Sequence, residues 1–224
     1  MDRELPMFPL EMALLPDDDL PLRIFEPRYT RLVGDSLATA ESLRASGSSS
    51  AAPEFGVVLI AAGREVGGGD NRYDVGTLAR IVEHQDLGGG KYTLRCRVSE
   101  RIRVSRWLPD DPYPRALVAS WPDEPGDAVT DASIENLQSR LTALFDKLAA
   151  ARGLELPPPD MLFGRVAMAE GAGDKLYALA SLVPMGQADR YAVLAAPSPS
   201  ARLHALSEAI ETVTAMVDFQ LPEN

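Results

Sequence analysis

The side chains that could carry out chemistry or bind a metal are few and widely spaced. The chain has one cysteine, Cys96, and two histidines, His84 and His204, and none of them has a second cysteine or histidine at metal-ligand spacing. Zinc sites are built from such closely spaced ligands, so the sequence predicts no metal site. Cys96 shares the parity of the apolar residues around it, which favours a buried, inert thiol over a nucleophile.

Three other features resemble functional motifs but lack their decisive residues. The acidic run Asp17–Asp19 lacks the alternating ligands, central glycine and distal glutamate of a calcium loop, so we interpret it as a solvated turn. The run Gly67–Gly69 could surround a phosphate, but no Lys-Ser or Lys-Thr follows it. The lysines, Lys91, Lys147 and Lys175, lie in no nucleophile motif, and no carboxylate pair can be assigned as acid and base. The sequence therefore predicts no catalytic residue and no cofactor.

A row of arginines is the remaining charged feature. Its members are Arg95, Arg97, Arg101, Arg103 and Arg106. The first four alternate with apolar residues over Tyr92–Val104, which predicts a strand with one core face and one basic face. We expect the arginines to pair with acidic side chains on neighbouring strands, and the alternative is a site for an acidic peptide or RNA. Glu100 interrupts the apolar row, so a bend or bulge is expected there.

The composition argues against several classes of partner. The net charge is −11, with 15 Lys and Arg against 20 Asp and Glu in residues 1–125, and 7 against 13 in residues 126–224. Nucleic acids and anionic membranes bind positive surfaces, so neither is expected as the main partner. No segment approaches the ~18 apolar residues of a membrane-spanning helix, and the N-terminus lacks the pattern of a signal peptide. With a single cysteine, the expected location is the cytoplasm.

The first half of the chain has the pattern of a small β-barrel. Strands are predicted at residues 5–10, 20–25, 55–61, 74–82, 92–104 and 115–121. Apolar residues recur at helical spacing after Pro27, which predicts a helix from there to about Arg44. Gly88–Gly90 predicts a tight hairpin turn. The prolines of the first strand, Pro6 and Pro9, favour the edge of a sheet.

The pattern becomes helical after a linker-like stretch at residues 122–127. Apolar residues from Ile134 to Leu148 recur at helical spacing, which predicts a helix that Asp131 or Ser133 could cap and Gly153 could end. Further helices are predicted at residues 159–170, 174–182, 187–194 and 200–219. We therefore expect an α+β fold with a β-rich domain over residues 1–125 and a helical domain over residues 126–224.

Five stretches, in this order, resemble a known family. They are Met7–Leu10, Leu20–Tyr29, Phe55–Ala61, Asp74–Val82 leading into Tyr92–Val104, and Val183–Leu203. The order resembles the N-terminal substrate-binding domain of Lon proteases, as found in stand-alone Lon-domain proteins. The resemblance implies a PUA-like pseudo-barrel of about six strands with one helix, followed by an α-helical bundle. In Lon this region helps to select unfolded or tagged polypeptides and supports oligomerisation. The Lon ATPase P-loop and Ser-Lys peptidase domain are missing from this sequence, so the implied role is non-catalytic.

The implied partners are unfolded or exposed polypeptide segments, together with a separate protease or chaperone. An extended segment could add to the sheet edge, or an apolar patch in a cleft between the two halves could hold it. The candidate peptide-binding residues are Leu14, Leu15, Leu20, Phe25, Arg28, Tyr29, Met161 and Phe163. Two interpretations fit the strand–helix junction. One is structural, with Phe25 and Tyr29 in the core and Glu26 and Arg28 capping and bracing the junction, and the other is that the segment forms the rim of a peptide groove.

Three functional hypotheses follow from these observations. The favoured one is a polypeptide-binding adaptor or chaperone-like factor in protein quality control. The alternative is an RNA- or nucleotide-binding PUA-like protein that uses the arginine row. The third is a hydrolase, for which the sequence offers no pair of nucleophile and base.

Overall fold

The computed structural model of this protein describes residues 2–48, 51–62 and 71–220. The chain divides into two compact units, Met1–Pro122 and Asp123–Asn224, which we call the barrel unit and the helical unit. The glycine run considered above as a phosphate loop, Gly67–Gly69, lies outside the described residues.

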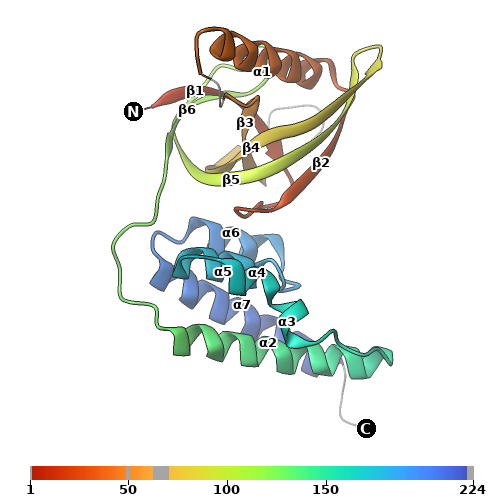
Figure 1. Cartoon of the computed structure of the whole chain (residues 1–224), viewed down its shortest axis with the longest axis vertical. Coiled ribbons are helices and arrows are strands. Elements are labelled where there is room, and N and C mark those ends of the chain that lie inside the picture. Colours follow the sequence, from red (N-terminus) through yellow and green to blue (C-terminus); the bar gives the residue numbers. More distant parts are fainter. Residues whose placement is uncertain (1, 49–50, 63–70, 221–224) are drawn as a thin grey trace. The chain divides into compact units, whose positions relative to one another are not determined.

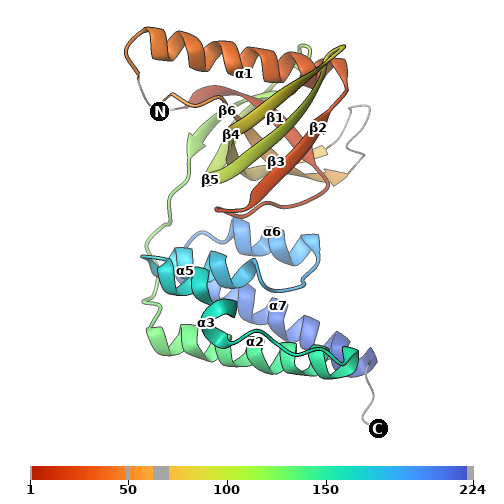
Figure 2. The same ribbon diagram turned by 45° about the vertical axis from the view of Figure 1, so that its right-hand side comes forward.

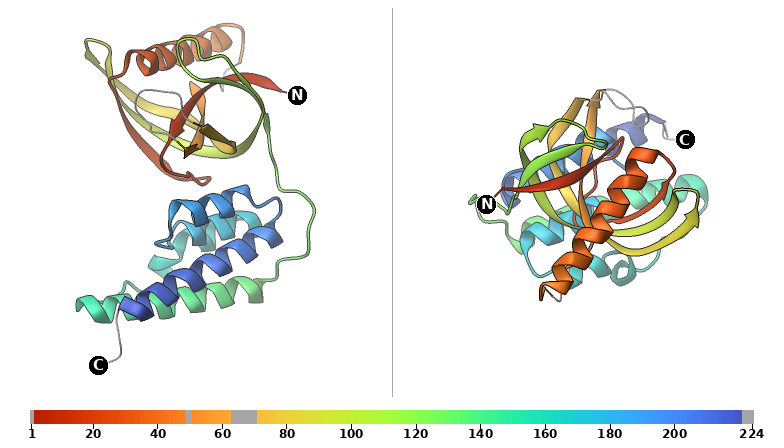
Figure 3. Two further views of the ribbon diagram at one scale, coloured as in Figure 1. Left: turned by 180° about the vertical axis from the view of Figure 1, so that it is seen from behind. Right: turned by 90° about the horizontal axis from the view of Figure 1, so that it is seen from above.

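The barrel unit is a six-stranded sheet with one helix, α1 (Pro27–Ala45). The strands are β1 (Arg3–Leu10), β2 (Asp19–Ile24), β3 (Glu54–Ala62), β4 (Asn71–Gly88), β5 (Lys91–Leu108) and β6 (Arg115–Ser120). They follow the order β2-β5-β4-β3-β1-β6, and β6 also pairs with β5, which closes the sheet into a ring (Figure 3). The predicted α+β class, with a pseudo-barrel ahead of a set of helices, is confirmed.

The prediction that β1 lies at a sheet edge is wrong. Its first half, Arg3–Pro6, pairs with β6, and its second half, Met7–Leu10, pairs with β3. Apart from Met7, whose N–H also donates to the carbonyl of Pro114 at 2.8 Å, each half pairs with one strand only, which explains how an inner strand tolerates Pro6 and Pro9.

The hairpin of β4 and β5 is longer than predicted. Its turn residues Gly88, Gly89 and Gly90 all have positive φ (79°, 61° and 74°), as the glycine run predicted. Within the register Thr77 pairs with Arg101 and Ala79 with Val98. The partner strand thus has one extra residue at Ser99–Glu100, and the bulge expected at this point is confirmed.

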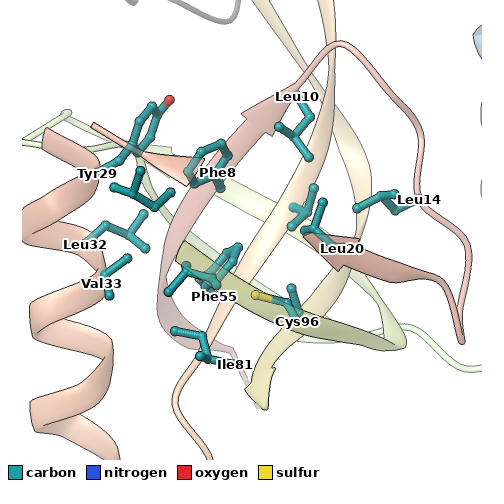
Figure 4. Close-up of a cluster of buried hydrophobic side chains, with 14 of the residues drawn as sticks. Phe8, Leu10, Leu14, Leu20, Tyr29, Leu32, Val33, Phe55, Ile81 and Cys96 are labelled. Carbon is teal, nitrogen blue, oxygen red and sulfur yellow. The ribbon is translucent and has the colours of Figure 1, made fainter. Parts of the chain in front are cut away.

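The barrel unit has two apolar clusters, because neighbouring residues of β1 point to opposite faces of the sheet. Phe8 and Leu10 belong to one apolar cluster, whereas Leu5 and Met7 belong to another. The first cluster also takes in α1, which covers one end of the barrel (Figure 2). Figure 4 shows this cluster, with Cys96 inside it.

The helical unit contains α2 (Asp131–Arg152), α3 (Pro159–Leu162), α4 (Gly164–Met168), α5 (Ala172–Ala180), α6 (Gln187–Ala195) and α7 (Pro199–Gln220). The long helices α2 and α7 lie side by side (Figure 1). Neither expected residue caps α2: the hydroxyl of Thr130 accepts the N–H of Ser133 at 3.2 Å instead. The helix expected over residues 159–170 is divided at Phe163.

Candidate functional site

An apolar groove of about 500 Å³ opens on the helical unit. It lies between the C-terminal halves of α2 and α7 and the chain segments that follow α2 and α5. The lining residues are Phe145, Leu148, Ala149, Arg152, Leu154, Glu155, Leu156, Leu182, Pro184, Val213, Met216, Val217 and Gln220. Met216 is 52% exposed and Leu154 is more exposed still, so large apolar side chains meet solvent at the groove.

The end of α2 determines one wall of this groove. Gly153 adopts a left-handed conformation with φ 62°, and its N–H bonds to the carbonyl of Ala150. The N–H of Leu154 donates a hydrogen bond to the carbonyl of Ala149 at 2.9 Å. This bonding pattern closes the helix end and brings the residue after the glycine back against the last turn. Leu154 and Leu156 consequently line the groove rather than leave the helix.

The chemistry of the groove suits binding of apolar side chains. Most of its lining is aliphatic or aromatic, and Arg152, Glu155 and Gln220 supply the polar groups. Pockets of this composition hold apolar groups by removing them from water, while a few polar side chains meet the backbone of the ligand.

Five of the eight candidate peptide-binding residues are buried, and for Tyr29 this is the core position that the structural interpretation expected. Leu14, Leu15, Leu20 and Tyr29 lie in the barrel core, and Phe163 is buried in the helical unit. The apolar residues of the first loop turn inward because the acidic run behind them bonds to the backbone. The carboxylate of Asp18 accepts the N–H of Leu15 at 2.8 Å, and Asp17 donates its N–H to Val98 at 3.0 Å.

The other three predicted residues reach the surface. Phe25 is 63% exposed, so its expected place in the core is wrong. Arg28 bonds to Glu26 at 3.1 Å and lies 4.4 Å from the ring centroid of Tyr29, so the bracing expected of it is confirmed. Met161 is 71% exposed, but it does not line the apolar groove. The cleft between the two halves, where these residues were expected to meet, stays a prediction.

Two members of the arginine row pair with neighbouring strands as expected. Arg95 on β5 bonds to Glu83 on β4 at 2.5 Å, and Arg97 bonds to Asp19 on β2 at 3.2 Å. These guanidinium groups are therefore partly neutralised, which lowers their value as an anion-binding surface.

Arg101 does not belong to the solvated face. It is 4% exposed, and its guanidinium lies 4.3 Å from the ring centroid of Trp121. Arg103 lies 3.6 Å from the same centroid. The backbone N–H of Trp121 donates to the carbonyl of Arg101 at 2.9 Å, so the indole is held over this part of β5. The bulge beside Arg101 and this indole explain why simple alternation fails here.

The environment of Cys96 does not suit a nucleophile. Burial raises the pKa of Cys96 to about 12, which keeps the thiol protonated and is opposite to what a nucleophile needs. Within the residues that the structure describes, no three His, Cys, Asp or Glu side chains gather so that they could hold a metal ion. None of the described helices has the length and apolar content needed to cross a membrane.

The apolar groove was missed by sequence reasoning. The only local signal was Leu154 directly after the helix-ending Gly153. The opposite wall comes from Val213, Met216 and Val217, far away along the chain. Periodicity predicted both helices but could not show which parts of them pack side by side.

Comparison with known proteins now identifies the family. Residues 4–212 match the substrate-binding domain of ATP-dependent protease La (LON), and the chain belongs to this family. Lon protease 1 of Herpetosiphon aurantiacus is 27% identical over an alignment of 214 residues, and the match covers 90% of this chain and 24% of that protein. The chain thus spans about a quarter of the length of this relative.

A solved structure shows the same fold. The crystal structure of a Lon N-terminal domain protein from Xanthomonas campestris has a TM-score of 0.60 and 25% identity, and the match covers 92% of this chain and 98% of that one. The N-terminal domain of Mycobacterium avium complex Lon protease has a TM-score of 0.49 and 13% identity over 97% of both chains.

Proposed function

We propose that this protein is a non-catalytic module that binds unfolded or exposed polypeptide segments and serves as an adaptor or chaperone-like factor in protein quality control. The observation that carries the proposal is the match of residues 4–212 to a substrate-binding domain. The apolar groove of the helical unit supports it, since unfolded chains differ from folded ones mainly in their exposed apolar side chains. A single buried cysteine suits work in the reducing cytoplasm.

Binding can be measured by fluorescence polarisation of a labelled, permanently unfolded polypeptide, such as reduced and carboxymethylated casein. We expect saturable binding in the micromolar range, because an extended segment loses much conformational entropy when it docks. No binding at several hundred micromolar would contradict the proposal.

The apolar groove can be tested by placing a charge in it. Met216→Glu and Leu154→Glu should each weaken binding at least about tenfold, because the docked apolar side chain would then face a carboxylate. Met168→Glu is the matched control, since Met168 is an exposed methionine of the helical unit outside the groove. Equal affinity in all three variants would place binding elsewhere.

The non-catalytic part of the proposal needs its own measurement. The purified protein should leave unfolded casein intact over many hours, with and without ATP and Mg²⁺. The appearance of cleavage products that a general protease inhibitor does not remove would contradict it.

A further inference from the structure

The outer part of β4 is bonded on one side only. The pairing of β3 with β4 runs up to Glu54 opposite Arg80, and the last bond joins the N–H of Ile81 to the carbonyl of Pro53 at 2.9 Å. Beyond this point Val82–Gly88 pairs with β5, and in the described sheet no strand lies on its other side. All seven residues are exposed. We call this segment the outer β4 edge.

The outer β4 edge is well supported from behind. The facing part of β5 also pairs with β2 over Asp19–Ile24, so the edge belongs to a three-stranded part of the sheet. The turn is fixed as well, because Asp86 accepts the N–H of Gly88 at 2.8 Å and Thr30 on α1 donates to the carbonyl of Gly90 at 2.5 Å. Figures 1 and 2 show the hairpin end beside the first turns of α1. A strand added here would meet a preformed template, which lowers the entropy cost of binding.

A second sheet margin, the far side of β2, is a weaker template. Pro21 stands in the middle of that six-residue strand and supplies no N–H. The outer β4 edge has the sequence Val-Glu-His-Gln-Asp-Leu-Gly, without proline, so every residue keeps its donor and acceptor.

We propose that the outer β4 edge binds an extended polypeptide segment as an additional β-strand, with Lys or Arg among its residues and apolar side chains between them. This inference rests on the proposed function and assigns a binding mode to it. The alternating backbone donors and acceptors of a strand edge match those of another extended chain, whatever its sequence. Glu83 and Asp86 are the charged residues of the edge; Glu83 already pairs with Arg95 of β5, so Asp86 carries most of the negative charge that favours a basic segment over an acidic one. A second copy of this chain would bring the same acidic edge, which is unfavourable.

The direct test is amide hydrogen exchange on the full chain, with a ten-residue peptide of alternating valine and lysine as the probe. A saturating amount of this peptide should slow exchange at amides within Val82–Gly88, because those facing the edge gain carbonyl acceptors. A peptide with alternating valine and glutamate should have a much smaller effect at the same concentration.

Charge variants test the side-chain part of the inference. Glu83→Gln with Asp86→Asn should weaken the lysine peptide about two- to five-fold, as expected for exposed charge pairs, and the asparagine can still accept the N–H of Gly88. Glu135→Gln, an exposed change on α2, is the control and should leave the affinity unchanged.

The outcomes separate this inference from the proposed function. If unfolded casein or the lysine peptide binds and exchange at Val82–Gly88 is not slowed, the edge proposal is overturned and the polypeptide-binding function stands. If neither binds, both fall. Slower exchange at Val82–Gly88 together with weaker binding of the double variant supports the edge.

Discussion

The guanidinium of Arg202 on α7 is fully buried and holds the carboxylate of Asp123 through hydrogen bonds of 2.5 and 3.1 Å. It also lies 3.8 Å from the ring centroid of Tyr177 on α5. Gly173 packs so closely that an added Cβ would lie 2.8 Å from Nη1 of Arg202. Asp123, the first residue of the helical unit, is thus bonded to α7, and the same arginine side chain packs on α5.

Loss of Asp123 should therefore destabilise the helical unit. Asp123→Ala leaves a buried cation without its partner, so the free energy of unfolding should fall by about 3 kcal/mol. Urea unfolding followed by far-UV circular dichroism reports this change, while the fluorescence of Trp107 and Trp121 follows the barrel unit. Glu211→Ala, which breaks the more exposed pair with Arg140, is the control and should cost less than about 1 kcal/mol. Equal losses in the two variants would contradict this account.

The stability of the barrel unit should decrease in alkali. Burial first, and then the hydrogen bond to Asp35 at 2.8 Å, raise the pKa of Tyr113 from 10.0 to about 12. Burial raises the pKa of Cys96 from 9.0 to about 12. The unfolded chain releases both protons at lower pH than the folded one, so the stabilisation is complete below about pH 9 and is lost as the pH rises toward 12.

Urea midpoints from pH 8 to pH 11 test this dependence. The double variant Cys96→Ala with Tyr113→Phe should be less stable at pH 8 but should lose less stability between pH 9 and pH 11 than the unchanged protein. Parallel curves for the two proteins would show that these groups do not cause the alkaline loss.

Two glycines of the barrel should differ in how well they tolerate a methyl group. A Cβ at Gly76 would overlap the backbone carbonyl of Val57, whereas one at Gly56 would meet the flexible side chain of Met7 and lie 2.9 Å from Ile102. Gly76→Ala should cost about 3 kcal/mol and Gly56→Ala about 1 kcal/mol, because a backbone cannot move aside as a methionine can. Tryptophan fluorescence in urea measures both. The ranking would be refuted if Gly56→Ala were the more damaging change.

Phe25 and Tyr29 should differ strongly in their response to truncation, although they lie only four residues apart. Tyr29 is buried and stacks on Phe8 with ring centroids 4.1 Å apart, so Tyr29→Ala should cost about 3 kcal/mol. The exposed Phe25 should change stability by less than about 0.5 kcal/mol when replaced by alanine. Phe25→Ala is therefore a clean variant for polarisation assays of the strand–helix junction. A large stability loss in Phe25→Ala would show that the ring packs against the barrel.

The comparison of sequence with structure shows what local patterns can predict. Alternation along β5 placed Cys96 in the core and pointed to the bulge near Glu100, because both depend on residues close together in the chain. Arg101 was assigned wrongly since its cover, Trp121, comes from beyond β6. The prolines of β1 were interpreted as an edge signal, because sequence alone does not show that the strand changes partner after Pro6.

The candidate binding surfaces were harder to predict than the fold. An apolar residue beside a turn can be covered or exposed, and hydrogen bonds of Asp17 and Asp18 decided this for Leu14 and Leu15. The outer β4 edge exists because β3 ends earlier than its neighbour, and strand lengths are poorly defined by sequence patterns. The apolar groove lies between helices that are far apart in the sequence, so no local sequence pattern marks it.

The pairing of β1 with β6, in which Arg3 faces Val118, joins the beginning of the barrel unit to its end. During synthesis Arg3 leaves the ribosome long before Val118 has been translated. The growing chain must therefore carry Leu5 and Met7, later buried, without their final neighbours. Nascent barrel units are thus incomplete for most of their translation, and apolar residues that are buried in the finished fold stay uncovered during that interval.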